Sequence, residues 1–221
     1  RVPLNPDFRI SMPTLLHIDS SPLGDTSVSR ELSGFHAEQW LRANPGSHVI
    51  RRDLAKEKIP VIGEDWIHST FVPEDSRNPA QNEILSLSDT FIAELEAADE
   101  YAIGLPMHNF TVGAALRLWI DQLVRIGKTF DYVDGQATGL LKGKSARFFI
   151  ASGGTYPSGS DRALRDFAEP YLRTVFAYMG ITDVYFFKAE GTVALRSGSI
   201  DRAAFLQPHF DAIRRRLAEA S

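Results

Sequence analysis

The chain has 221 residues and contains no cysteine. A chain without cysteine forms no disulfide, no thiol nucleophile and no thiolate metal site. Its apolar runs are also short, because they have the length of strands and fall well below the roughly 20 residues that a membrane helix needs. These absences predict a cytoplasmic protein with no membrane partner.

Positive charge is scarce. The chain has 24 lysine and arginine residues against 28 aspartate and glutamate residues, which gives a formal net charge of -4 at pH 7. The arginines at positions 214–216 are explained by the solvated face and carboxyl end of a terminal helix. Without a basic tract, nucleic acid is not an expected partner.

Several catalytic patterns are missing as well. The six histidines show no close paired spacing with carboxylates, and no Gly-x-Ser-x-Gly elbow occurs, so neither a metal site nor a serine hydrolase is expected. Residues 139–145 resemble a Walker loop but are one residue short. They also precede a strand instead of following one, which favours a turn with solvated lysines.

What the chain does contain is an alternation of strand and helix signals. Strand-like apolar runs are expected at residues 14–19, 48–53, 101–105, 147–151 and 184–187. Helical spacing of apolar residues is expected from about 29 to 44, and at 79–98, 112–126, 164–180 and 200–220. Five strands alternating with helices predict an α/β fold, a doubly wound five-stranded parallel sheet with helices on both faces.

Three details complete this expectation. Pro106 is expected to end the third strand, and Asp134-Gly135 to form a turn between extended pieces at 129–133 and 140–141. Residues 55–77 form an excursion too long for an ordinary connection.

Residues 1–11 are polar and irregular, and they are expected to be a leader, a cloning remnant or an over-extended start. Residues 12–221 are expected to form one domain, because 43% of the chain is hydrophobic and a chain of this length can bury one large core.

The loop at residues 20–29 is the strongest functional feature. It is rich in hydroxyl groups, follows the first strand and leads into a helix, so it offers backbone N–H groups, hydroxyls and a helix dipole to one anion. It has no lysine or arginine before Arg30, which suits a permanently bound cofactor phosphate better than a transferred phosphoryl group. An ordinary helix-capping loop is the alternative interpretation.

Two later segments also follow strands. Residues 106–110 present a proline, a thioether, an imidazole, an amide and an aromatic ring, which together could hold a flat heterocycle. Gly153-Gly154 permits close backbone approach to a planar ligand. Because ligands of doubly wound sheets bind beyond the carboxyl ends of strands, these segments are expected to converge on one cleft.

Taken together, these segments resemble the FMN-dependent NADH:quinone oxidoreductases, also called FMN-dependent NADH-azoreductases. Residues 127–132, 180–184 and 189–191 contribute to the same resemblance, which covers the chain from Met12 onward. The resemblance implies a flavodoxin-like fold and a homodimer with two FMN molecules near the subunit interface. It also implies a ping-pong reaction in which NADH, or NADPH, and then a quinone or azo compound occupy the same place on the flavin.

The resemblance assigns site residues as well. The positions implied to bind the FMN phosphate are Ser21, Ser27, Val28 and Ser29; those implied to bind its ring system are Pro106, Met107, His108, Asn109 and Phe110; the third binding loop is Ser152, Gly153 and Gly154. Phe130 and Tyr132 are expected to complete the substrate pocket. No general acid or base is implied, and the chain's role is to position and tune the flavin through Asn109 and His108.

Two departures from the family pattern stand out. The family often has tyrosine where this chain has His108, and arginine where it has Ser152. His108 either titrates near neutrality and favours an anionic reduced flavin, or only fills space. The absent arginine leaves the preference between NADH and NADPH open.

Two functions from other classes remain open at this point. One is a flavodoxin-type electron carrier, which would bind FMN but pass single electrons to a protein. The other is a catalytically silent flavodoxin-like binding protein, which would purify colourless. The modest acidity and the phosphate loop speak against the carrier.

Overall fold

The computed structural model describes residues 12–220, so the expected leader at residues 1–11 lies outside the described residues. The strands are β1 (Thr14–Asp19), β2 (His48–Asp53), β3 (Glu100–His108), β4 (Thr111–Val112), β5 (Phe130–Val133), β6 (Gln136–Gly139), β7 (Ser145–Ala151) and β8 (Asp183–Ala189). The α-helices are α1 (Val28–Ala43), α2 (Glu64–Thr70), α3 (Pro79–Ala97), α4 (Ala114–Leu123), α5 (Ala168–Tyr178), α6 (Val193–Arg196) and α7 (Arg202–Ala220). Short 3₁₀ turns occupy Gly24–Thr26, Glu74–Ser76 and Ala163–Arg165.

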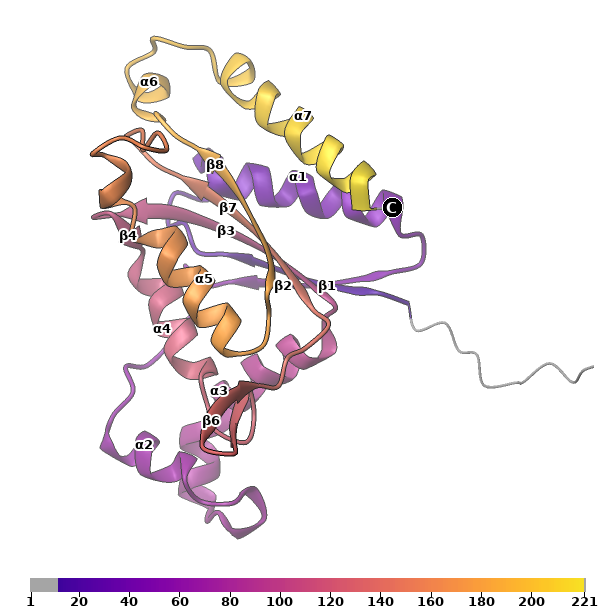
Figure 1. The fold of residues 1–221 in the computed structure, drawn as a ribbon, viewed down its shortest axis with the longest axis vertical. Coiled ribbons are helices and arrows are strands. Elements are labelled where there is room, and N and C mark those ends of the chain that lie inside the picture. The colour runs from indigo at the N-terminus through magenta and orange to yellow at the C-terminus, as the bar shows by residue number, and fades with distance from the viewer. Residues whose placement is uncertain (1–11, 221) are drawn as a thin grey trace, which may run out of the picture.

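Five parallel strands form the central sheet in the order β2-β1-β3-β7-β8, which confirms the predicted doubly wound fold. The polar strand β2 lies at one edge, as its composition indicates. Helices α1 and α7 cover one face and α3, α4 and α5 cover the other (Figure 1). Within the described residues, no helix is both long enough and apolar enough to cross a membrane.

Alternating side chains of the strands build a core on each face. In β7, Phe148 and Ile150 are buried under α3, α4 and α5, whereas Phe149 is buried under α1 and α7. Successive residues of a strand point to opposite faces, so a strand covered on both faces is apolar throughout. This explains why the strand runs lack the alternation of a half-exposed sheet.

The register of the sheet brings the carboxyl ends of its strands together. Asp19 at the end of β1 pairs with Gly104 in β3, and Pro106 in β3 pairs with Ala151 at the end of β7. Ala151 in turn pairs with Ala189 at the end of β8. The loops that follow β1, β3, β7 and β8 therefore leave the sheet at one edge.

The expectation that Pro106 ends the third strand is wrong. β3 continues to His108, because its last residues pair antiparallel with β4: Met107 lies opposite Val112 and His108 opposite Thr111. A proline is tolerated near a strand end, where few ladder hydrogen bonds are lost. The two-residue turn between β3 and β4 consists of Asn109 and Phe110.

Other boundaries also move. The expected helix at 112–126 is shorter, ending at Leu123, because the Thr129 hydroxyl donates to the Leu123 carbonyl at 2.7 Å. The expected helix at 164–180 begins only at Ala168, whose N–H donates to Oδ1 of Asp166 at 3.0 Å. The Asp134-Gly135 turn is confirmed, but its second strand is β6 rather than residues 140–141.

The excursion after β2 contains α2 and is tied to α4. The indole N–H of Trp66 donates to Oε1 of Gln122 at 2.9 Å, and the amide of Gln122 donates to the Pro60 carbonyl at 3.2 Å. Trp66 and Gln122 are both buried, so these bonds hold the excursion against the helices of that face.

Gly104 allows α1 to pack closely on β3. A Cβ at this position would lie 2.5 Å from Oγ of Ser33, 2.7 Å from Oδ1 of Asp19 and 2.9 Å from the Ser29 carbonyl oxygen. The loop after β1 is joined to the same place, since Ser20 donates its N–H and its hydroxyl to the Gly104 carbonyl at 3.0 and 3.1 Å. A missing side chain on β3 thus sets the position of α1 and the loop before it.

Arg30 anchors the same loop from the other side. Its Nε donates to the Ser21 carbonyl at 2.8 Å, and its two terminal nitrogens bind both carboxylate oxygens of Asp53 at the end of β2. The hydrogen bonds from Arg30 hold the pKa of the Asp53 carboxyl below its usual range. The first basic residue after the loop is therefore used to fix the loop's backbone.

We predict that Gly104→Ala destabilises the protein by about 1–3 kcal/mol, because the added methyl group overpacks a contact between backbone and buried polar groups. Urea unfolding of both proteins measures the difference. Gly34→Ala is the matched control, since a Cβ at Gly34 meets no atom within 4 Å. Equal stability of Gly104→Ala and the parent protein would contradict the close packing.

We also predict that Asp53→Asn lowers stability by about 1 kcal/mol near neutral pH, because it removes the charge from a bidentate pair with Arg30. The pKa of Asp53 is lowered in the folded state, so its contribution is present above the ordinary value of 3.8 and is lost as the pH falls through the folded-state pKa. Urea unfolding between pH 3 and pH 7 checks this. A stability difference that grows toward low pH would refute it.

Candidate functional site

The loop between β1 and α1 presents buried hydroxyl groups at a helix start. Ser27 is the N-cap of α1 and accepts the Arg30 N–H at 3.4 Å, while its hydroxyl lies 3.1 Å from that of Ser29. Ser21 is also fully buried, and its hydroxyl accepts the Leu23 N–H at 3.4 Å. Because the first N–H groups of a helix have no acceptor within the helix, this loop concentrates donors around one point.

The turn between β3 and β4 is held in an unusual backbone conformation. Asn109 has a φ of 47° and Phe110 a φ of 70°, values that fit a type I′ hairpin turn. A left-handed conformation is costly for phenylalanine, and such strain is concentrated at functional sites. Phe110 is nonetheless 46% exposed, so the turn is not maintained by burying its ring. Its carbonyl accepts the Phe167 N–H at 2.9 Å.

The loops after β7 and β8 are bonded to each other. The Ser152 carbonyl accepts both the N–H of Thr192 at 3.0 Å and its hydroxyl at 3.1 Å. The Gly154 carbonyl accepts the Gly191 N–H at 3.1 Å, and the Ser152 hydroxyl donates to the same carbonyl at 2.9 Å. These bonds fix the start of α6 beside the glycine pair.

The four loops surround a cavity of about 430 Å³, which we call the central cavity. Its lining comes from the loop after β1, the end of β3, the loop after β7, and α6 with the start of α7. The lining residues are Ser21, Leu23, Thr26, Ser27, Val28, Pro106, Met107, His108, Ala151, Gly153, Thr192, Val193, Leu195, Arg196 and Arg202.

The predicted convergence of the loops is thereby confirmed. The predicted residues that line the central cavity are Ser21, Ser27, Val28, Pro106, Met107, His108 and Gly153. The others flank it: Ser29 and Ser152 are buried, Gly154 is exposed on the loop, and Asn109 and Phe110 form the exposed turn beyond His108. What each of them binds remains a prediction.

One wall of the central cavity was not predicted. It comprises Thr192, Val193, Leu195 and Arg196 around α6, together with Arg202. These residues follow β8, and the rule that ligands bind beyond the carboxyl ends of parallel strands could have indicated them. Their composition carries no recognisable motif, whereas the loops after β1, β3 and β7 do.

A second cavity of about 390 Å³ shares His108 with the central cavity, and we call it the side cavity. Its lining residues are Ser20, Pro22, Leu54, Ala55, Glu57, Lys58, Ile59, His108, Gly113, Ala114, Ala115 and Leu118. The excursion after β2 therefore supplies one wall of the side cavity and α4 another. His108 stands between the two cavities.

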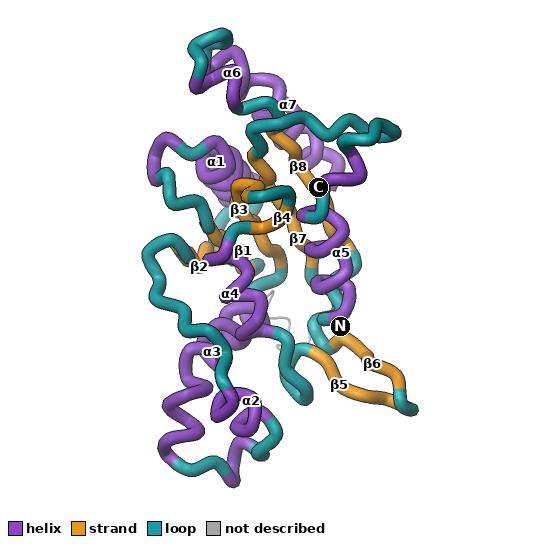
Figure 2. Tube along the Cα trace, turned by 90° about the vertical axis from the view of Figure 1, so that its left-hand side faces the viewer, coloured by secondary structure: helices purple, strands orange, loops and turns teal. Residues whose placement is uncertain are grey.

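Phe130 and Tyr132 do not line either cavity. They lie on the β5–β6 hairpin, which stands clear of the sheet (Figure 2). The Phe130 ring contacts the Tyr178 ring of α5 at a centroid distance of 4.8 Å, and Tyr132 is 57% exposed. Within one chain, these residues are remote from the loops that form the central cavity.

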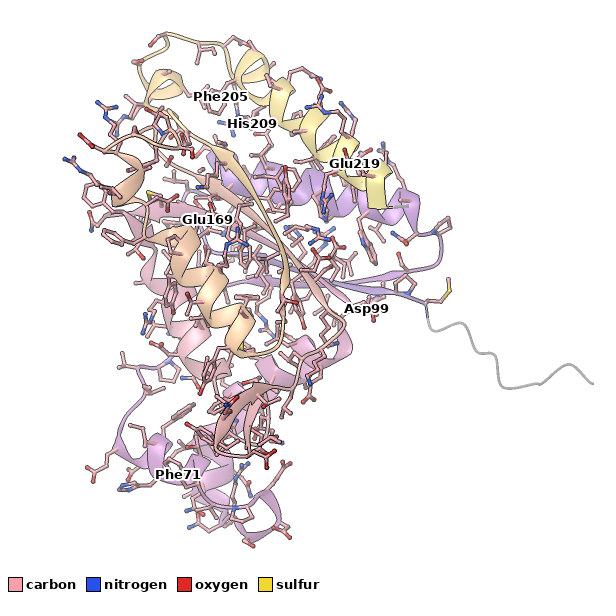
Figure 3. All side chains as sticks on the ribbon, viewed as in Figure 1. Phe71, Asp99, Glu169, Phe205, His209 and Glu219 are labelled. Carbon is pink, nitrogen blue, oxygen red and sulfur yellow. The ribbon has the colours of Figure 1, made fainter. Side chains whose placement is uncertain are left out.

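A larger cavity of about 600 Å³ lies between the loop after β7, β8 and α7. Its charged groups have partners, since Lys188 binds Asp166 at 2.8 Å and Glu190 accepts the Tyr156 N–H at 2.9 Å. His209, seen on α7 in Figure 3, also lines it, and burial lowers the pKa of this histidine. An acidic cavity of this kind is unsuited to an anionic cofactor.

The described residues contain no group of three or more histidines and carboxylates that could hold a metal ion. The central cavity, by contrast, suits a phosphate ester joined to a flat ring. Buried hydroxyls and a helix start lie at one end, and Met107 and Pro106 lie at the other. Gly153 leaves room there, because a Cβ would approach Val193 to 3.2 Å.

Comparison with known proteins agrees with this geometry. A family described as having a flavodoxin-like fold matches residues 13–217. "FMN-dependent NADH:quinone oxidoreductase 3" of Burkholderia lata is 47% identical over 200 residues, which are 90% of this chain and 97% of that protein. "FMN-dependent NADH:quinone oxidoreductase" of Acidobacterium capsulatum is 47% identical over 203 residues, covering 92% of this chain and 98% of its own.

Solved structures show the same architecture. An azoreductase from Bacillus anthracis str. Sterne superposes with a TM-score of 0.81 at 25% identity, covering 92% of this chain and 98% of that one. An FMN-dependent NADH-azoreductase of B. anthracis str. Ames Ancestor, in complex with FMN, superposes with a TM-score of 0.82 at 22% identity, covering 95% and 99%. With the full-length match to its relatives, these findings show that the chain belongs to the FMN-dependent NADH:quinone oxidoreductases, a family with the flavodoxin-like fold.

Proposed function

We propose that the chain is an FMN-dependent NADH:quinone oxidoreductase. The observation that carries this proposal is the central cavity, which joins an anion-binding helix start to a ring-sized wall of Pro106 and Met107. Relatives at 47% identity bear the name of this activity over nearly the whole chain.

The phosphate of FMN is assigned to the loop between β1 and α1. Ser21, Ser27 and the first N–H groups of α1, at Val28 and Ser29, supply donors without the strong charge of a lysine. Ser29 supports Ser27 through their 3.1 Å hydroxyl contact. Neutral donors suit a cofactor that stays bound while its phosphate takes no part in the reaction.

The ring of FMN is assigned to the far end of the central cavity. Met107 and Pro106 pack against it, and the glycine loop at Gly153 allows close approach. Asn109 presents an amide that can donate or accept at the ring edge, and its left-handed backbone aims this amide away from the sheet. Neither residue transfers a proton, so their role is to orient the ring.

When bound, FMN accepts hydride from NADH and passes two electrons to a quinone. The chain must offer both reactants an apolar place beside the ring, and the side cavity provides it. Ile59, Ala114 and Leu118 line the side cavity, and His108 joins it to the central cavity. Such a pocket selects acceptors weakly, because a methylene group is worth only about 1–3 kcal/mol.

We extend the acceptors to aromatic azo compounds and the donors to NADPH. The structural similarity to azoreductases supports the first extension, and the lack of an arginine at Ser152 supports the second. The same dependence on NADH, an intracellular reductant, supports a cytoplasmic location.

We also propose that the protein is a homodimer in which the hairpin of one chain reaches the flavin of the other. The exposure of Tyr132 and Val133, at 57% and 54%, supports this arrangement, since such residues are buried at interfaces. It would reconcile the predicted role of Phe130 and Tyr132 with their distance from the cavities of their own chain.

Anaerobic absorbance spectroscopy of the FMN-supplemented protein tests the proposed activity. NADH is expected to bleach the flavin bands, and a quinone added next is expected to restore them. A protein that retains no flavin, or whose flavin is bleached by neither NADH nor NADPH, would contradict the proposal and favour a carrier or a silent binding protein.

We predict that Asn109→Ala lowers turnover about tenfold with little loss of bound FMN, because one orienting hydrogen bond is removed. Alanine is also strained at a φ of 47°, so Asn109→Gly is the matched control that removes the amide without that strain. Both variants are expected to be slow in steady-state assays. Full activity of Asn109→Gly would show that only the backbone matters.

We predict that Tyr132→Ala raises the KM for a quinone about two- to tenfold, because it removes an aromatic contact, while Tyr132→Phe retains most of it. Mixing Tyr132→Ala with Asn109→Ala distinguishes the origin of the hairpin. If it comes from the partner, mixed dimers contain one intact site and activity rises above that of either variant. No rise in proven mixed dimers would contradict the shared site.

A further inference from the structure

Two arginines outside the phosphate loop share the central cavity with it. Arg196 is the last residue of α6 and Arg202 the first of α7, and both line the cavity together with Ser21, Thr26 and Ser27. The connection between the two helices thus carries two guanidinium groups to a site whose own loop offers only neutral donors.

The charge around the loop gives these arginines a purpose. Asp25 lies within the loop and Glu31 in the first turn of α1, so carboxylates surround the place where a phosphate would bind. Arg30 does not offset them, because it is bound to Asp53 and to the Ser21 carbonyl. A helix start contributes only about half a positive charge, which is small against a phosphate dianion.

Arg202 neutralises one of these carboxylates. Its Nε and one terminal nitrogen both donate to Oε2 of Glu31, at 3.0 and 2.6 Å. This pair also joins the start of α7 to the start of α1. Without Arg202, Glu31 would present an uncompensated negative charge beside the phosphate loop.

Arg196 has no such partner. Among the described residues its guanidinium makes no hydrogen bond and no ion pair, although it lies on the wall of the cavity. Its backbone is well placed, because α6 begins at Thr192, which is bonded twice to the Ser152 carbonyl. A rigid wall therefore presents a free cation to the cavity.

We propose that Arg196 and Arg202 form a cationic clamp on the phosphate of FMN, with Arg196 acting on the phosphate and Arg202 cancelling Glu31. The clamp rests on the proposed function, since it assumes that FMN occupies the central cavity. The chemistry recognised is a phosphate monoester, which the 2′-phosphate of NADPH shares. The position of both arginines on the same cavity as Ser27 favours FMN.

Binding of FMN and of riboflavin to the apoprotein, followed by flavin fluorescence, tests the clamp. Arg196→Ala is expected to weaken FMN binding about five- to tenfold and to leave riboflavin binding unchanged, because only FMN carries the phosphate. Arg196→Lys is expected to retain most of the affinity. Inorganic phosphate is expected to compete with FMN less effectively in Arg196→Ala than in the parent protein.

Arg215→Ala is the matched control, since Arg215 is an exposed arginine near the other end of α7. It removes the same charge and is expected to change neither affinity. Arg202→Ala is expected to weaken FMN binding selectively as well, because Glu31 loses its counter-charge.

Two outcomes overturn the clamp. An equal effect of Arg196→Ala on FMN and riboflavin would mean a structural role, and unchanged FMN binding with a raised KM for NADPH alone would assign the arginines to the dinucleotide. Failure of the parent protein to bind FMN at all would instead refute the proposed function, so the two failures are distinguishable.

Discussion

The parallel pairing of the central sheet is the constraint on which the site depends. Pairing of Asp19 with Gly104, of Pro106 with Ala151 and of Ala151 with Ala189 places four strand ends side by side. Each strand then delivers its following loop to the same edge, so segments separated by more than a hundred residues share one cavity. The close contact at Gly104 sets α1 against this edge, and with it the helix start that faces the cavity.

The site combines neutral donors with charges that are mostly consumed by the fold. Arg30 holds the backbone of the phosphate loop through Ser21 and Asp53, and Arg202 is paired with Glu31. Arg196 alone offers an unpaired cation among these three. Such an arrangement suits a cofactor that must be retained rather than consumed, because binding is spread over many weak donors while the reaction itself belongs to the cofactor.

The sequence predicted the parallel sheet and three of the four loops, because apolar strand runs, the hydroxyl-rich loop at 20–29 and the glycine pair at 153–154 are local signals. It missed what depends on tertiary contacts. β4 forms only because Thr111 and Val112 pair with the end of β3, so Pro106 misled the prediction. The α6 wall has no motif, and the excursion after β2 acquires its place from Trp66 and Gln122, which are 56 residues apart.

Hydrogen exchange of the amide groups, with and without FMN, tests most directly whether the central cavity holds the cofactor. FMN is expected to protect residues 20–29, 106–110, 151–154 and 191–202, because these segments line or adjoin that cavity. The loop at 157–166 and the segment around His209, which line the larger acidic cavity, are expected to exchange as before. Protection centred on that acidic cavity, or none in the loop at 20–29, would contradict the account.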